Sequence, residues 1–150
     1  MRRILAAQRA LPETVRRLSW VSFWNDLASE LLYPVLPLLL TGVLGAPVAA
    51  VGIIEGAAEG VAIGLRAVSG WLSDEEGGRR RPWISAGYAL SVLARPLIAI
   101  APAWGVVLGA RLLDRTGKAV RTAPRDALLR EATPPGQLGS AFGFHRAMDT

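Results

Sequence analysis

Long apolar stretches alternate with short segments that are polar or rich in Gly and Pro. Four stretches are complete, at about 20–43, 48–71, 83–101 and 104–122, and a fifth begins near residue 139. Roughly 20 apolar residues suffice for an α-helix to cross the hydrocarbon of a bilayer. The pattern therefore predicts an all-α, polytopic membrane helix bundle with four complete spans and the start of a fifth.

The segments between the spans differ in charge. Residues 41–47 and 101–104 carry no charge, whereas residues 74–82 (DEEGGRRRP) and the region around Arg125 and Arg130 are rich in arginine. Membrane proteins keep their basic loops in the cytoplasm. We therefore expect a multi-pass protein of the plasma membrane whose N-terminus is cytoplasmic.

Residues 1–19 form a basic segment ahead of the first span. It has no continuous apolar core and no small-residue cleavage site, so it is not a cleavable signal peptide. Ile4, Leu11, Val15 and Leu18 fall on one helical face, which suits an amphipathic helix on the cytoplasmic surface, but a disordered tail fits equally well. We expect residues 20–150 to be a partial N-terminal transmembrane bundle, completed by a missing C-terminal half.

Ionisable side chains interrupt the spans. Arg66 and Arg95 are two of them, and the other eight are Asp26, Glu30, Glu55, Glu59, Arg111, Asp114, Arg115 and Lys118. Each would cost roughly 2.5–3.5 kcal/mol at the centre of a bilayer, so they should face protein or water. Their spacing gathers them into one stripe per helix. We interpret the eight as a substrate or proton pathway; a static ion network that only holds helices together is the alternative.

Small residues and prolines mark other faces of the spans. Gly52, Gly56, Gly60 and Gly64 recur every fourth residue, beside the face that carries the glutamates. Such a ridge lets a second helix approach closely, so we predict a packing contact there. Pro34 and Pro37 should bend the first span near its outer end.

The loop after the second span resembles the signature loop of the major facilitator superfamily, which reads G-x-L-x-D-R-x-G-R-R. The matching residues are Gly70, Asp74, Gly77, Arg79 and Arg80. Arg111 and Gly117 are similar to the pattern of the fourth helix in that family. SFWNDLASELLYPVLP, GKAVRTAPRDAL and GFHRAMDT look like a bacterial subgroup whose substrates are largely unassigned. Glu75 and Gly78 depart from the loop signature, and Asp114 replaces a usual Gln.

The resemblance implies two six-helix halves with substrate bound between them at mid-depth. It implies a secondary active transporter of a small solute in the bacterial inner membrane, working by alternating access and most simply coupled to protons. The loop residues would then help gate the conformational change, and Arg95, on an outer helix, would be structural. As a hypothesis, Glu59 pairs with Arg115 or Lys118 until substrate or a proton breaks the pair. His145 is either a helix-start contact or a proton relay.

Other function classes fit less well. The chain has no Cys and one His, so we expect no metal and no cofactor. Its net charge of +5 is explained by basic loops, without nucleic acid. Gly117 and Lys118 are followed by Ala119, so there is no phosphate-binding loop for ATP. An intramembrane phosphatidyltransferase would need more aspartates than Asp114 and Asp126. We therefore predict no enzyme; a membrane protein for assembly or sensing remains an alternative, and the sequence does not identify a substrate or a direction.

Overall fold

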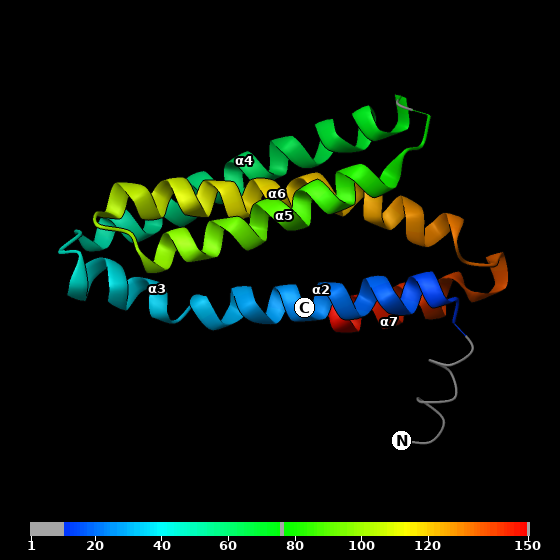
Figure 1. The fold of residues 1–150 in the computed structure, drawn as a ribbon, viewed down its shortest axis with the longest axis horizontal. Coiled ribbons are helices and arrows are strands. Elements are labelled where there is room, and N and C mark those ends of the chain that lie inside the picture. The colour runs from blue at the N-terminus through cyan, green and yellow to red at the C-terminus, as the bar shows by residue number, and fades with distance from the viewer. Residues whose placement is uncertain (1–10, 76, 150) are drawn as a thin grey trace, which may run out of the picture. The chain divides into compact units, whose positions relative to one another are not determined.

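The computed structural model of the chain describes residues 11–75 and 77–149, and all regular structure in that part is helical. The elements are α2 (Glu13–Leu32), α3 (Val35–Leu38), the π-helix η1 (Leu39–Val43), α4 (Val48–Glu75), α5 (Arg80–Ala99), α6 (Trp104–Glu131), the 3₁₀-helix η2 (Pro135–Gln137) and α7 (Leu138–Met148) (Figure 1). The prediction of an all-α fold is confirmed for these residues. The chain divides into two compact units: Met1–Glu30 with Arg125–Thr150 (unit 1), and Leu31–Pro124 (unit 2).

Two helical stretches in the described residues, Glu13–Val43 and Val48–Glu75, are long and apolar enough to cross a membrane. They match the first two predicted spans. Helices α5 and α6 have 20 and 28 residues, but neither passes the same test of hydropathy and charge. In α6 the reason is the series of charged side chains that begins at Arg111. The measure of length and hydropathy thus supports two of the four predicted spans.

The first apolar stretch is interrupted at the first of its two prolines. Helix α2 ends at Leu32, and Pro34 caps the short helix α3. Pro34 has no N–H to donate to a preceding turn, which explains a break at this position. The chain then widens into the π-helix η1, and Gly45 (φ +64°) provides the turn into α4.

Unit 2 is built on α4, α5 and α6, which run side by side (Figure 1). Its apolar core contains Leu36, Leu40, Ile54, Ile98 and Val107. The Ser69 hydroxyl of α4 donates to the carbonyl of Ala119 on α6 at 3.2 Å, and the Ser91 hydroxyl of α5 donates to the carbonyl of Asp114 at 3.2 Å. Hydrogen bonds from small polar side chains therefore connect both α4 and α5 to α6.

The closest approach of two helices in unit 2 lies at Gly87 on α5 and Gly117 on α6. A Cβ built on Gly87 would lie 2.6 Å from the Gly117 carbonyl oxygen, and one on Gly117 would lie 2.5 Å from the Gly87 oxygen. No side chain larger than hydrogen fits at such distances. Gly117 belongs to the fourth-span pattern, whereas the sequence analysis did not select Gly87.

The predicted packing ridge on α4 makes no such contact. No heavy atom of the described residues lies within 4 Å of a Cβ built on Gly52, Gly56, Gly60 or Gly64, apart from the helix's own backbone. The buried face of α4 is instead lined by Ala50, Ile54, Ala58 and Ala62. Small residues thus occur on two faces of α4, and the packing contact at the glycine ridge stays a prediction. Spacing alone does not say which face meets a neighbour.

Unit 1 is formed by α2, the end of α6 and α7. Its apolar cluster contains Leu11, Val15, Leu129 and Ala141, with Leu18 packed against it. Residues 13–19 are the first turns of α2, so they form neither a separate surface helix nor a disordered tail. Ile4, the remaining member of the predicted amphipathic face, lies outside the described residues. The apolar face of residues 11–18 exists, but it packs against protein.

Candidate functional site

A forked ion pair in unit 2 joins α6 to α4. The Arg111 guanidinium donates through Nε and Nη2 to the two carboxylate oxygens of Glu55, at 2.8 and 2.7 Å. The side chain of Arg111 is only 3% exposed, and that of Glu55 is 23% exposed. Forked pairs of this kind are among the strongest and most directional in proteins. Glu55 therefore faces α6, as the stripe of charges predicted.

A chain of weaker ion pairs extends from this fork in both directions. Outward, Arg115 lies 3.7 Å from Glu55 and 3.9 Å from Glu59, and Arg66 lies 4.0 Å from Glu59. Inward, Asp114 lies 3.5 Å from Arg111 and 3.9 Å from Arg95 of α5. Along the outward branch side-chain exposure rises from 3% at Arg111 to 51% at Glu59, whereas on the inward branch it reaches only 16%, at Arg95. We call these seven residues the ion ladder: Arg95, Asp114, Arg111, Glu55, Arg115, Glu59 and Arg66.

The ion ladder contains five of the eight predicted pathway residues. Glu59 approaches Arg115, one of its two predicted partners, at the long distance given above. Lys118 is half-buried on α6, and Glu30 is exposed on α2. Asp26 belongs to unit 1 and is buried there. Arg95, expected to be structural, does pair with Asp114, in a buried position between α5 and α6.

The predicted gating loop is held by ion pairing and by two left-handed glycines. The Arg80 guanidinium pairs with Asp74 and also donates to the Ser73 hydroxyl at 3.2 Å. Gly77 and Gly78 have φ values of +70° and +75°, a conformation that residues with a Cβ rarely adopt. This explains the departure at Gly78, because two consecutive left-handed residues close the turn.

The remaining loop residues have different roles. Gly70 is a packing position on α4, since a Cβ built there would lie 3.1 Å from the Ala123 side chain of α6. Arg79 is exposed and stands immediately before α5, with no side-chain hydrogen bond to the helix end. Asp74 pairs with Arg80, one of the two arginines, Arg79 and Arg80, of the predicted gating loop.

A buried arginine on α6 was not selected from the sequence. Arg121 is 1% exposed; it donates to the Ser91 hydroxyl at 2.9 Å and lies over the Tyr88 ring at 4.6 Å. Both contacts are to α5, and the second is a cation–π interaction. A signal was present, because Arg111, Lys118, Arg121 and Arg125 continue one helical face. Arg121 lies inside the predicted fourth span, 104–122, whereas Arg125 lies beyond it, in what was expected to be a basic loop.

A second polar cluster, in unit 1, surrounds Arg125. Its guanidinium forks onto Asp149 of α7, with Nη1 to Oδ1 at 2.7 Å and Nη2 to Oδ2 at 2.8 Å. Nη1 also donates to the Ser22 hydroxyl of α2 at 3.1 Å. Asp26 on α2 is buried in the same unit, and its Oδ1 accepts from the Asn25 amide nitrogen at 3.4 Å. His145, fully buried, contacts the Ser19 hydroxyl through Nδ1 at 3.1 Å, so a helix-to-helix contact is present at this residue.

Arg125 and Asp149 were both missed as candidate site residues. Asp149 stands four residues after His145, at the spacing that places both on one face of a helix, and this was the available signal. Within the described residues no group of three or more His, Cys, Asp or Glu is arranged to hold a metal ion. Both clusters can bind charged groups through their forked guanidinium groups and buried carboxyl groups.

Comparison with known proteins identifies the family. The model of the Major Facilitator Superfamily matches residues 18–150. MJ1317, an uncharacterized MFS-type transporter of Methanocaldococcus jannaschii, is 37% identical over 143 residues, which are 95% of this chain and 35% of that protein. Rv2265, an uncharacterized protein of Mycobacterium tuberculosis, is 42% identical over 113 residues, which are 75% of this chain and 27% of that protein.

The chain thus spans about a third or less of the length of these relatives. No solved structure matches it. The resemblance first drawn from the loop residues and from the fourth span is confirmed by the family match over nearly the whole sequence. The chain belongs to the Major Facilitator Superfamily.

Proposed function

We propose that the chain is the N-terminal part of a secondary active transporter that moves a small solute by alternating access and is coupled to protons. In this proposal residues 20–150 supply four spans and the start of a fifth. The remainder of the protein supplies a second half, and residues 1–19 begin in the cytoplasm. The observation that carries the proposal is the ion ladder, because charged residues buried at membrane depth usually mark a path for substrate or ions.

The graded exposure of the ion ladder supports a binding role over a purely static one. An ion pair that only holds helices together is expected where both partners are buried. Here Glu59 and Arg66, at the outer end, are about half exposed, whereas the side chain of Arg111, in the middle of the ion ladder, is only 3% exposed. A charged solute can therefore compete for the outer pairs while the inner fork keeps α4 and α6 together.

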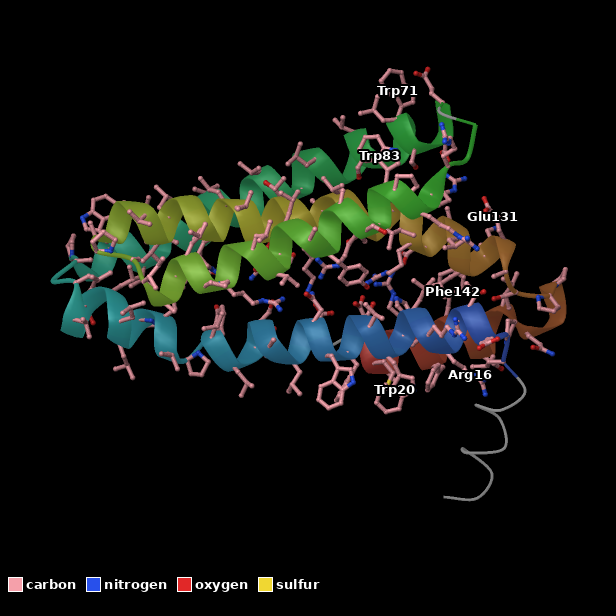
Figure 2. The ribbon with its side chains drawn as sticks, viewed as in Figure 1. Arg16, Trp20, Trp71, Trp83, Glu131 and Phe142 are labelled. Carbon is pink, nitrogen blue, oxygen red and sulfur yellow. The ribbon has the colours of Figure 1, made fainter. Side chains whose placement is uncertain are left out.

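Tryptophan side chains at the ends of two helices support a location in a bilayer. Trp71 projects from the last turns of α4, and Trp83 lies in the first turns of α5 (Figure 2). Trp71 is 60% exposed. Tryptophan is enriched where a membrane meets water. The loop between these helices carries the arginines of residues 79–81, which suits the cytoplasmic side of the plasma membrane.

The test is transport by the full-length protein reconstituted in proteoliposomes with an imposed pH gradient. A panel of small cations, zwitterions and anions is added, and collapse of the gradient is followed with a pH-sensitive dye. We expect at least one class to collapse it, and the Glu59→Gln variant to lose that response. An unchanged rate and pH dependence in Glu59→Gln removes Glu59 from the mechanism. Failure of every compound to couple to the gradient rejects proton-coupled transport.

A further inference from the structure

The arginines of the ion ladder differ in how fully they are bonded. Arg111 donates to both oxygens of Glu55, at 2.8 and 2.7 Å, and its side chain is only 3% exposed. Arg115, one turn further along α6, lies 3.7 Å from Glu55 and 3.9 Å from Glu59. Both distances exceed the length of an N–H···O hydrogen bond. Arg115 therefore has charged neighbours but no directional bond to either of them.

The hydrogen-bonding capacity of Arg115 is unmet. Its Nε is buried and has no hydrogen-bond partner among residues 11–75 and 77–149. A guanidinium group presents its N–H donors in a fork that matches the two oxygens of a carboxylate. A buried donor without an acceptor costs free energy, which an entering oxygen atom would recover. Since the side chain is also 23% exposed, Arg115 combines unmet donors with an opening to solvent.

The carboxylates of the ion ladder, by contrast, each lie between two guanidinium groups. Glu55 lies between Arg111 and Arg115, Glu59 between Arg115 and Arg66, and Asp114 between Arg111 and Arg95. A cationic solute would have to displace an arginine from one of these carboxylates before it could bind. An anionic solute meets no such obstacle at Arg115, whose carboxylate neighbours are both at long distance.

The charge of unit 2 around the ion ladder also favours an anion. The ladder contains one more arginine than carboxylates. The other charged side chains of unit 2 are those of residues 74–81, in the predicted gating loop, and Lys118 and Arg121 on α6. These two residues of α6 add further positive charge, whereas the acids of α2 belong to unit 1. Because burial of unbalanced charge is costly, a ligand with one negative charge suits the ladder best.

We propose that Arg115 binds the carboxylate group of the transported solute through a forked pair, and that the solute displaces Glu59 from Arg115. This inference rests on the proposed function, because it names the substrate class of the same site. The entering carboxylate takes the guanidinium group of Arg115, and Glu59 keeps Arg66 as its neighbour. The fork of Arg111 on Glu55 stays closed and holds α4 against α6.

The test is the thermal stability of the full-length protein in detergent. Sodium acetate, sodium lactate and sodium benzoate are the anionic probes, choline chloride is the cationic probe, and sodium chloride is the reference at equal ionic strength. A probe that binds the folded protein raises the midpoint of unfolding, and the dependence on its concentration gives an apparent dissociation constant.

Three variants separate the fork from the charge. Arg115→Gln removes the proposed binding group, and Arg115→Lys keeps its charge without the fork. Arg130→Gln, at an exposed position near the end of α6, is the matched control for the loss of one positive charge. Because the ion contacts of Arg115 are long, neither substitution of it should unfold the protein.

We expect at least one of the three carboxylates to raise the midpoint. Arg115→Gln should weaken its binding roughly tenfold or more, Arg115→Lys should weaken it less, and Arg130→Gln should not change it. Glu59→Gln should tighten the binding, because the competing carboxylate is gone.

Three results would overturn the proposal: no response to any carboxylate, equal binding by wild type and Arg115→Gln, or stabilisation by choline that Glu59→Gln abolishes. The measurement uses no gradient and no transport, so each of these results leaves the proposed transport activity untouched. Conversely, a protein that fails the transport assay can still bind a carboxylate at Arg115.

Discussion

Replacing Gly117 by alanine is expected to destabilise the fold by separating α5 from α6. A methyl group at this position would lie 2.5 Å from the Gly87 carbonyl oxygen, 2.8 Å from the Ser91 hydroxyl and 2.9 Å from the Ser91 nitrogen. Two of these three atoms belong to the backbone of α5, which cannot turn aside as a side chain can. The helices must therefore move apart.

The expected size of the effect follows from two opposing contributions. Forcing extra volume into a close-packed contact costs typically about 1–3 kcal/mol. Separation also lengthens the hydrogen bond from Ser91 to the Asp114 carbonyl, which lies at the same contact. Against this, alanine in a helix interior is favoured over glycine by roughly 0.5–1 kcal/mol. The net change in the free energy of unfolding should be a loss on the order of 1–2 kcal/mol.

The assay is denaturant unfolding of the full-length protein in detergent, followed by tryptophan fluorescence. Gly109→Ala is the matched control, because Gly109 lies on the same helix and nothing lies within 4 Å of its added Cβ. It should be neutral or slightly stabilising. Gly87→Ala should resemble Gly117→Ala, and the double variant should cost less than the sum, because both relieve one contact. Equal stabilities of Gly117→Ala and Gly109→Ala would refute the reasoning.

Two further predictions concern unit 1 and the gating loop. Asp149→Asn removes the forked carboxylate of the buried Arg125 and should lower the free energy of unfolding by about 3 kcal/mol. Asp126→Asn removes only a longer contact to Arg125, at 3.5 Å, and the half-exposed pair with Arg146, so it should change that free energy by less than about 1 kcal/mol. Equal losses in the same unfolding assay would contradict this. Gly78→Ala forces a side chain to adopt a φ of +75° and should cost about 1–2 kcal/mol, whereas Gly136→Ala, at an open position without positive φ, should not.

The positions of the helices were predictable, but the end of α6 was not. The loops before Val48 and Trp104 contain the glycines and prolines that stop a helix, and both helices begin where the sequence placed them. The predicted fourth span ended at residue 122 because arginines follow. Helix α6 continues to Glu131, and Arg125, which follows the predicted end of the span, has a protein partner in Asp149. An apolar criterion cannot anticipate a charged residue that is paired inside the fold.

Contacts between helices were predictable from charged side chains, but not from small residues. The stripes of opposite charge on α4 and α6 correctly placed Glu55 opposite α6, since few other surfaces could accept it. For small residues the sequence did not show which helix face would make a contact. Gly52 and Gly56 look more regular than the single Gly87, yet Gly87 makes the close contact. A glycine permits the close approach of a second helix. The residue that it faces on that helix decides whether the two helices come close.

The two charge clusters differ in how a charged group could reach them, and this difference suits different tasks. In the ion ladder the outer pairs are long, at 3.9 and 4.0 Å, and Glu59 is half exposed, so water screens them and breaking them costs little. In unit 1 the Arg125–Asp149 fork is short and closed to solvent, so separating it is expensive. A solute that must enter and leave needs the first arrangement. The fork of unit 1 is suited instead to holding α6 against the end of α7.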